Sequence, residues 1–279
     1  MLTRSRNLPV EALSPLIEAL LAQLPDDESS TVPVISVKTE SVPSSPSAGG
    51  IKASHKKPTY DPTIVYILEF CTVLALSSPD TIEALGKQVA EALQTFLRNA
   101  SRYHSALVSR AAYYQFNMLK ASYVSIHDYP TLHAVLTCQD HDFVRAPVLL
   151  HTISSFPKEL LAKTSQLVLQ GLKICIEQPG PLRSEIMTSP DFWLMLRILA
   201  ANSHSSPTVF DILEGGVSGS PSAIIADNYE AAIALLSEYA TAAQVGAIEE
   251  QKGERRQRNA RPAKKEAARY VANKILIII

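Results

Sequence analysis

The sequence predicts an all-α protein, and three observations support that prediction. Only 10 of the 279 residues are glycine, which is too few for a β protein with many tight turns. Apolar residues recur at three- and four-residue steps through much of the chain, the period of one face of a helix. Helix-start signals follow one another with short loops between them. Because 46% of the residues are hydrophobic, the chain can form a sizeable core in one large domain or two small ones.

The first predicted helix covers residues 8–24. Its apolar residues form one stripe, and they are Leu13, Leu16, Ile17, Leu20, Leu21 and Leu24. Residues 25–60 differ, because they are rich in Ser and Pro and have no sustained periodicity. Such a composition buries too little apolar area to offset the entropy lost on ordering, so it predicts a disordered linker.

Later helices share a start signal in which Asp or Ser precedes Pro. The first residue can cap the free amides, and Pro occupies the first helical position, where no amide is needed. These pairs are Asp61–Pro62, Ser78–Pro79, Ser189–Pro190 and Ser206–Pro207. Asp227 with Glu230 three residues later resembles a capping box. The predicted helices cover residues 62–76, 79–101, 105–125, 130–138, 143–154, 158–177, 190–201, 207–213 and 228–243.

The helix predicted at 158–177 has an unusually wide apolar stripe. Leu161, Val168, Leu172 and Cys175 share one face, which is widened by Leu160, Leu167, Leu169 and Ile176. A stripe of this width predicts neighbouring helices on two sides. Paired helices without a strict sequence repeat are typical of HEAT- or armadillo-like solenoids. The predicted fold is therefore an all-α solenoid with a disordered N-terminal linker and a basic C-terminal tail.

The chain divides into four predicted parts. They are an N-terminal helical segment at 1–24, the linker at 25–60, the solenoid domain at 61–245 and the basic tail at 246–279. The tail's basic run contains Lys252, Arg255, Arg256, Arg258, Arg261, Lys264 and Lys265. Its apolar end, 275–279, is expected of a truncated or mis-spliced product. The basic run suits nucleic acid, acidic lipid or nuclear import, but a solvated extension is favoured because the run contains no base-stacking aromatic residues.

Charge and hydropathy narrow the function classes. The net charge of −1 gives no electrostatic reason to expect binding to nucleic acid or to an anionic membrane. The most apolar run, residues 64–76, contains Glu69 and is shorter than the roughly 20 residues that a membrane span needs. Cys71, Cys138 and Cys175 lie far apart in apolar stretches. They therefore predict buried free thiols in a reducing compartment.

The densest cluster of candidate metal ligands runs from His127 to His141. Cys138 and His141 are spaced to meet across one helical turn, and His133 and Asp140 lie close in sequence. No second spaced pair completes a set of four ligands, so the segment predicts an ordinary corner between helices. Asp128 would then cap the helix that follows Pro130.

Other patterns also favour structural roles. The chain has no Gly-x-Ser-x-Gly elbow, phosphate-binding loop or Gly-x-Gly-x-x-Gly turn. The glycine-rich residues 215–219 are interpreted as a helix C-cap and loop. The aromatic residues Tyr103, Tyr113, Tyr114, Phe116 and Tyr123 are interpreted as core rather than as a ligand box. The sequence thus predicts no catalytic, cofactor-binding or metal-ligating residue, and no cofactor.

Three stretches carry a family resemblance: 164–172, 189–196 with its Ser-Pro-Asp-Phe-Trp start, and 227–232. The region 160–239 that contains them resembles the helical part downstream of the catalytic domain in large Golgi Arf guanine-nucleotide exchange factors. The likeness is to the brefeldin-A-resistance type, and most closely to its fungal members. In that family an exchange domain with a Phe-Arg-Leu-Pro-Gly-Glu motif expels GDP from Arf, and this sequence lacks the motif.

The resemblance implies a downstream domain, as a fragment or a separate chain, that is not itself an enzyme. Such domains regulate exchange and help membrane recruitment. The implied partners are proteins, namely Arf or Rab GTPases and Golgi membrane proteins, without nucleic acid. The implied location is cytoplasmic and peripheral at the Golgi membrane. Two alternatives remain open. One is a stand-alone HEAT-like adaptor unrelated to Arf, and the other is an enzyme with a site near His127–His141.

Overall fold

The computed structural model describes residues 9–25, 58, 60–128, 145–202, 204–218 and 224–239. Every regular element in these ranges is a helix, which confirms the predicted all-α class for this part of the chain. The predicted helix at 130–138, nearly all of the linker and the basic tail lie outside the described residues.

Most predicted helices are present with small shifts at their ends. They are α2 (Val10–Leu21), α3 (Pro62–Ala75), α4 (Pro79–Arg98), α5 (Ser105–Asp128), α7 (Ala146–Ser154), α8 (Lys158–Ile176), α10 (Pro190–Ala200), α11 (Ser206–Ser218) and a final helix at 226–239. A short 3₁₀ turn, η1 (Ala100–Arg102), follows α4. The helix α9 (Pro181–Thr188) is not among the predicted helices. It has no side-chain cap at its start, and its eight residues are too few for a clear apolar period.

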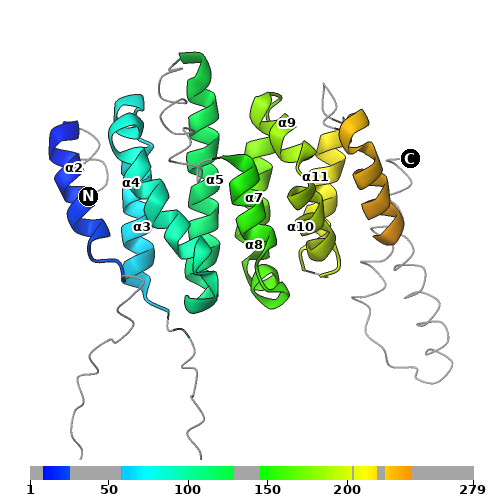
Figure 1. The fold of residues 1–279 in the computed structure, drawn as a ribbon, viewed down its shortest axis with the longest axis horizontal. Helices are drawn as coiled ribbons and strands as arrows, with labels where there is room; N and C mark the ends of the chain where they lie inside the picture. The colour runs from blue at the N-terminus through cyan, green and yellow to red at the C-terminus, as the bar shows by residue number, and fades with distance from the viewer. Residues whose placement is uncertain are drawn as a thin grey trace, which may run out of the picture.

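The helices form two rows that follow the order of the chain. In one row α2 contacts α4, α4 contacts α7 and α7 contacts α10, while in the other α3 contacts α5, α5 contacts α8 and α8 contacts α11. Contacts between the rows link α3 with α4, α4 with α5 and α10 with α11. Figure 1 shows the result as a progression from α2 at one side to helix 226–239 at the other.

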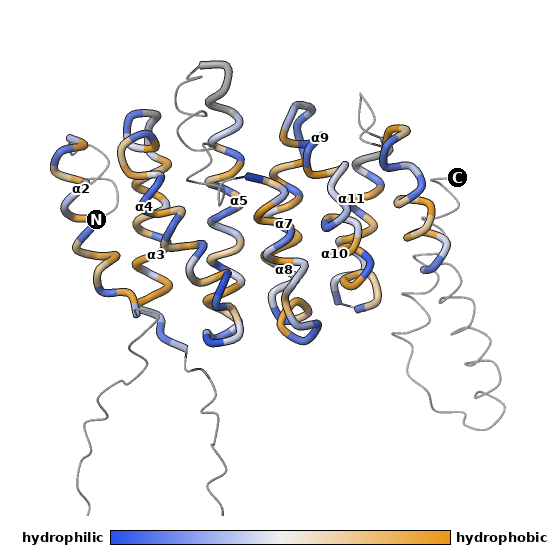
Figure 2. Tube along the Cα trace, viewed as in Figure 1, coloured by the Kyte–Doolittle hydropathy of each residue, from blue (hydrophilic) through white to orange (hydrophobic). Residues whose placement is uncertain are grey.

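One apolar core runs through the described helices. It includes Leu13 and Ile17 of α2, so the predicted N-terminal segment packs against α3 and α4 and joins the same core. At the other end Leu236 of helix 226–239 belongs to it. Figure 2 shows apolar and polar residues interleaved along the helices, as expected where one face of a helix is buried and the other is solvated.

Helices α5 and α8 approach each other closely at Gly171. A Cβ added to Gly171 would stand 2.4 Å from Cδ2 of Phe116, so only glycine fits there without a shift. The Cys175 thiol donates to the Phe116 carbonyl, with an Sγ–O distance of 3.4 Å. Besides α5, α8 contacts α9, α10 and α11, which confirms the prediction that its wide stripe has neighbours on two sides.

Two of the predicted Asp/Ser–Pro caps form as expected. Asp61 accepts a hydrogen bond from the Thr63 amide at 2.8 Å at the start of α3. Ser78 accepts from the Thr81 amide, and the Thr81 hydroxyl accepts from the Ser78 amide, so α4 begins with a complete capping box. Both bonds satisfy amides that the first turn of a helix leaves free.

The other predicted start signals are wrong in detail. Ser189 occupies the N-cap position of α10 but makes no side-chain capping bond. Helix α11 begins at Ser206 itself, and the Ser206 hydroxyl instead bonds that of Tyr239 at 2.6 Å. The last helix begins at residue 226, where the side chain of Asn228, rather than the Asp227–Glu230 pair, accepts from the Ile225 amide. At Ser206, the fold brings Tyr239 near, and the bond to Tyr239 replaces the expected capping bond.

The glycine-rich loop predicted after Glu214 is also wrong in part, because α11 continues to Ser218. A glycine within a helix costs only about 1 kcal/mol relative to alanine. The preceding turns are anchored by the buried side chains of Val209, Phe210 and Leu213. Extending an anchored helix needs no new nucleus, so Gly215 does not stop it.

Candidate interaction surface

The predicted candidate ligands fall largely outside the described residues. His127 and Asp128 form the end of α5, so Asp128 closes this helix, whereas His133, Cys138, Asp140 and His141 are not described. Within the described ranges, no three His, Cys, Asp or Glu side chains gather as a metal site would require. The helix corner predicted at residues 127–141 therefore stays a prediction, because most of these residues lie outside the described ranges.

Cys71 and Cys175 are free and buried, as predicted. Burial raises the pKa of each thiol to about 12. Because the thiolate is the reactive form, both remain protonated and unreactive at neutral pH. These two cysteines therefore contribute to packing in α3 and α8.

The predicted aromatic group is also core. Phe116 is fully buried, Tyr114 is nearly so, and Tyr103, Tyr113 and Tyr123 pack against the core while partly exposed. Tyr103 belongs to the turn before α5, where its ring lies 4.6 Å from that of Phe96. The interpretation as core rather than as a ligand box is confirmed for these five residues.

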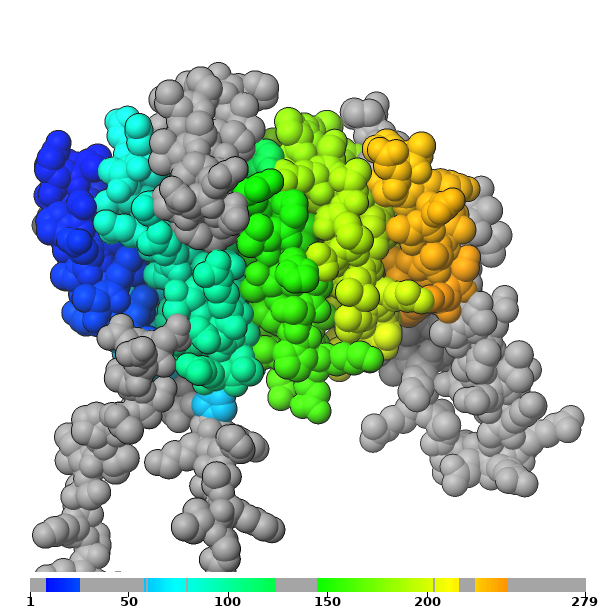
Figure 3. All heavy atoms as spheres, in the orientation of Figure 1, coloured from blue at the N-terminus to red at the C-terminus, as the bar shows by residue number. Residues whose placement is uncertain are grey.

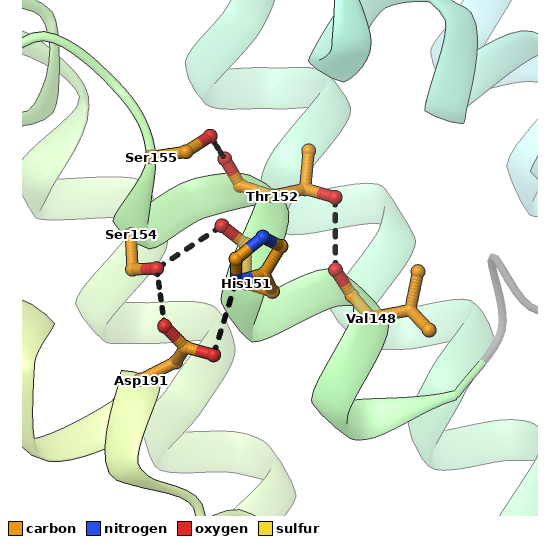
Figure 4. Close-up of polar contacts among 6 residues, drawn as sticks. All are labelled: Val148, His151, Thr152, Ser154, Ser155 and Asp191. Carbon is orange, nitrogen blue, oxygen red and sulfur yellow. Dashed lines mark hydrogen bonds and ion pairs between the residues drawn. The ribbon is translucent and has the colours of Figure 1, made fainter.

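A polar cluster joins α7 to α10, and Figure 4 shows its members. The Ser154 hydroxyl donates to the Asp191 carboxylate at 2.8 Å, and Nδ1 of His151 lies 3.3 Å from the other oxygen of that carboxylate. A catalytic triad needs the serine to contact the histidine ring, with the carboxylate on the far side of the ring. Here the carboxylate lies between them, so the cluster links two helices and does not activate Ser154 as a nucleophile.

A second surface feature combines aromatic and charged side chains on α3 and α5 and just before the start of each of these helices. We call it the α3–α5 aromatic patch, and it consists of Tyr60, Tyr66, Phe70, His104 and Arg110. The Tyr60 and His104 rings lie 5.4 Å apart, and the Tyr66 and Phe70 rings stack at 5.9 Å. Tyr66 is 58% exposed, the most exposed large apolar side chain in the described residues. Such exposure departs from the usual burial of aromatic rings and marks a candidate contact surface.

Arg110 of the patch and Glu69 of α3 both influence the buried hydroxyl of Tyr114. Burial raises the pKa of Tyr114 to about 12, with Arg110 opposing and Glu69 adding to the rise. The pKa of Arg110 is itself raised, first by the neighbouring Tyr114 hydroxyl. Glu69 on α3 and Arg110 on α5 therefore both influence the Tyr114 hydroxyl, from two different helices.

The sequence reasoning missed this patch. Tyr66 and Phe70 are four residues apart, so they share a face of α3, and that spacing was a usable signal. The run 64–76 is apolar almost throughout, which gave no indication of which side faces solvent. Tyr60 and His104 are far apart in sequence, and only the packing of α3 on α5 brings their rings together.

The stretches that carry the family resemblance occupy packing positions. Gly171 lies at the α5–α8 crossing, Trp193 is buried, and Asn228 is buried at the start of the last helix. The Trp193 indole donates to the Met187 carbonyl at 2.8 Å, which ties α10 to α9. These residues hold helices together and do not form a reactive site.

None of the described helices has the length and apolar character needed to cross a membrane.

Comparison with known proteins adds no family to this description. No protein-family model, no curated protein and no solved structure matches the chain.

Proposed function

We propose that this chain is a HEAT- or armadillo-like helical solenoid that binds another protein through the α3–α5 aromatic patch. In this proposal it is a non-catalytic regulatory or scaffolding domain of an Arf guanine-nucleotide exchange factor. It would act on the cytoplasmic side of the Golgi membrane, as a peripheral component. The observation that carries the proposal is the exposed aromatic patch on two helices of a packed double row.

The chemistry of the patch supports protein binding. Tyrosine and arginine are enriched among the residues that dominate binding energy at protein interfaces, because they bury large areas and keep a polar end. Tyr66 and Phe70 are held by their own stacking and by the buried side of α3. A partner would therefore meet side chains that lose little freedom on binding.

The assignment to Arf exchange factors rests on the resemblance of residues 164–172, 189–196 and 227–232. The matching residues include Gly171, Trp193 and Asn228, which pack helices in this structure. A shared set of packing residues is what two related helical domains would retain. The resemblance therefore supports a common fold and pathway, and the patch supplies the candidate partner surface.

The proposal is tested by Arf nucleotide exchange on liposomes, with the chain alone and with a separate exchange domain. We expect no exchange by the chain alone, and a changed rate or recruitment in the mixture. Tyr66→Ala should weaken that effect at least about tenfold, as expected for an interface hot spot. The matched control is Leu194→Ala, since Leu194 is similarly exposed at 47% but lies on α10.

Each other outcome contradicts a stated part of the proposal. Exchange by the chain alone would show that it is catalytic. No effect in the mixture would favour a stand-alone adaptor with other partners. An equal loss in Tyr66→Ala and Leu194→Ala, with thermal melts like that of the wild type, would remove the patch from the binding surface.

A further inference from the structure

The last described helix has an exposed apolar stripe. Ile225, Tyr229 and Ile233 follow one another at four-residue steps and are 44%, 56% and 38% exposed. The opposite side of helix 226–239 packs inward through Ala232, Leu235 and Leu236. Helix 226–239 contacts α10 through Arg197 and Glu238, and α11 through Ser206 and Tyr239. Figure 3 shows helix 226–239 at the opposite end of the described row.

The same end of the molecule is acidic. The residues 204–218 and 224–239 contain five acidic side chains and neither lysine nor arginine, a net charge of −5 with His204 neutral. The acidic residues are Asp211, Glu214, Asp227, Glu230 and Glu238. Arg197 of α10 reaches across to Glu238. The exposed acids Asp227 and Glu230 lie in the first turn of helix 226–239, next to Tyr229 of the apolar stripe.

The C-terminal residues of the chain have the complementary character. Residues 251–279 contain nine basic and two acidic side chains, a net charge of +7, and include the uninterrupted apolar run 275–279. The intervening residues, 240–250, extend at most roughly 40 Å. The last helix is about 21 Å long, at 1.5 Å per residue. The basic segment can therefore reach any part of the acidic end within one chain.

We propose that residues 251–279 dock on helix 226–239 in the same molecule. The basic side chains would lie against the acids of the last two helices, and the apolar run would cover Ile225, Tyr229 and Ile233. Opposite net charges favour this contact, and covering the stripe removes apolar surface from water.

Zero-length carboxylate–amine cross-linking of the full chain tests the contact directly. We expect cross-links from Lys264 and Lys265 to Asp227 or Glu230, located by mass spectrometry. In an equal mixture of ¹⁵N-labelled and unlabelled protein, these peptides should carry matching labels. Mixed labels would overturn the proposal in favour of contact between two copies, and absence of such cross-links would overturn it altogether.

Charge reversal separates docking from a general loss of structure. Arg255→Glu with Arg256→Glu and Arg258→Glu should raise hydrogen exchange in the 226–239 peptides several-fold. Asp227→Lys with Glu230→Lys should do the same, and the combined variant should regain protection. The matched control reverses Glu11 and Glu18, two exposed acids of α2 at the other end of the row, and should leave these peptides unchanged.

Outcomes of the hydrogen-exchange and vesicle-binding experiments could also overturn the proposed docking. If neither reversal changes exchange at 226–239, or if the combined variant is worse than both, the tail does not dock there. A contact made only with anionic lipid would also overturn the proposal. In that case the tail would bind phosphatidylserine vesicles in the full chain with the same affinity before and after reversal of Asp227 and Glu230.

Discussion

The middle of the helical row and its C-terminal end are joined in different ways. In the middle, α5 and α8 approach so closely that Gly171 faces the Phe116 ring without room for a methyl group. At the end, helix 226–239 packs through the buried side chains of Leu235 and Leu236, and it adds the exposed Arg197–Glu238 pair and the Ser206–Tyr239 hydrogen bond. The first joint depends on shape, and the second combines apolar packing with exposed polar contacts.

This difference predicts different responses to mutation and to solvent. A joint made by close packing is insensitive to salt but intolerant of added volume. A joint made by exposed charges is weakened by salt and tolerates changes of side-chain size. The middle of the row should therefore determine global stability, whereas the end should open locally at lower cost.

The largest loss of stability is expected from a substitution at Trp193. This residue lies on the buried side of α10, the helix that also carries Arg197. Trp193→Ala should destabilise the protein by about 3–5 kcal/mol, because it removes a large buried ring and the bond to the Met187 carbonyl. Urea denaturation measures this, with Trp193→Phe as a milder control. An unchanged midpoint would mean that α10 is not held by its buried face.

A pair of glycine substitutions tests the shape of the middle joint. Gly171→Ala should cost about 1–3 kcal/mol, since the new methyl group would overlap Phe116. Gly215→Ala in α11 meets nothing within 4 Å and should stabilise the helix by up to about 1 kcal/mol. Thermal melts of both variants give the comparison. Shifts of the same sign would argue against a tight α5–α8 crossing.

A smaller effect is expected at the C-terminal joint. Arg197→Gln should cost about 0.2–1 kcal/mol, because both partners of the Arg197–Glu238 pair are substantially exposed. The loss should shrink as salt is raised from 0.05 to 1 M, since exposed charges are screened (about 3 Å Debye length at 1 M). A double-mutant cycle with Glu238→Gln isolates the pair. A coupling that salt leaves unchanged would contradict the comparison.

The smallest effect at neutral pH is expected from the buried thiols of Cys71 and Cys175. Their pKa of about 12 in the fold exceeds the ordinary value of 9.0. The unfolded chain therefore loses these protons first, and stability falls as pH rises above about 9 and on toward 12. Stability measured between pH 7 and 10.5 should fall less in Cys71→Ala. Rapid alkylation of either thiol in the native protein at pH 7 would contradict their burial.

Local sequence predicted the start of some helices and not of others. Ser78 and Ser206 both precede proline, yet Ser78 caps α4 while Ser206 bonds Tyr239. Tyr239, the partner of Ser206, lies 33 residues away in sequence, so no local pattern could reveal this bond. Similarly, α9 has a proline start but only a short apolar face, and its packing against α7 and α8 supplies what its sequence lacks.

The candidate surface shows the same limit. Sequence periodicity predicted that Phe116 would be buried, because large apolar residues at helical spacing usually form the core. It did not distinguish Tyr66 from its neighbours in the apolar run of α3. Which ring of that run stays exposed depends on where α4 and α5 lie against α3.

The sequence by itself determined that the described chain is helical, where most of its helices lie and which faces of them are apolar. These properties follow from a 3.6-residue period and from the fixed geometry of proline, both of which act within a few residues. Only the tertiary structure decided that Gly171 is a packing residue, that Ser206 bonds Tyr239, and that the rings of Tyr60 and His104 meet. These depend on helices distant in sequence, because contacts between them form only when the rows pack.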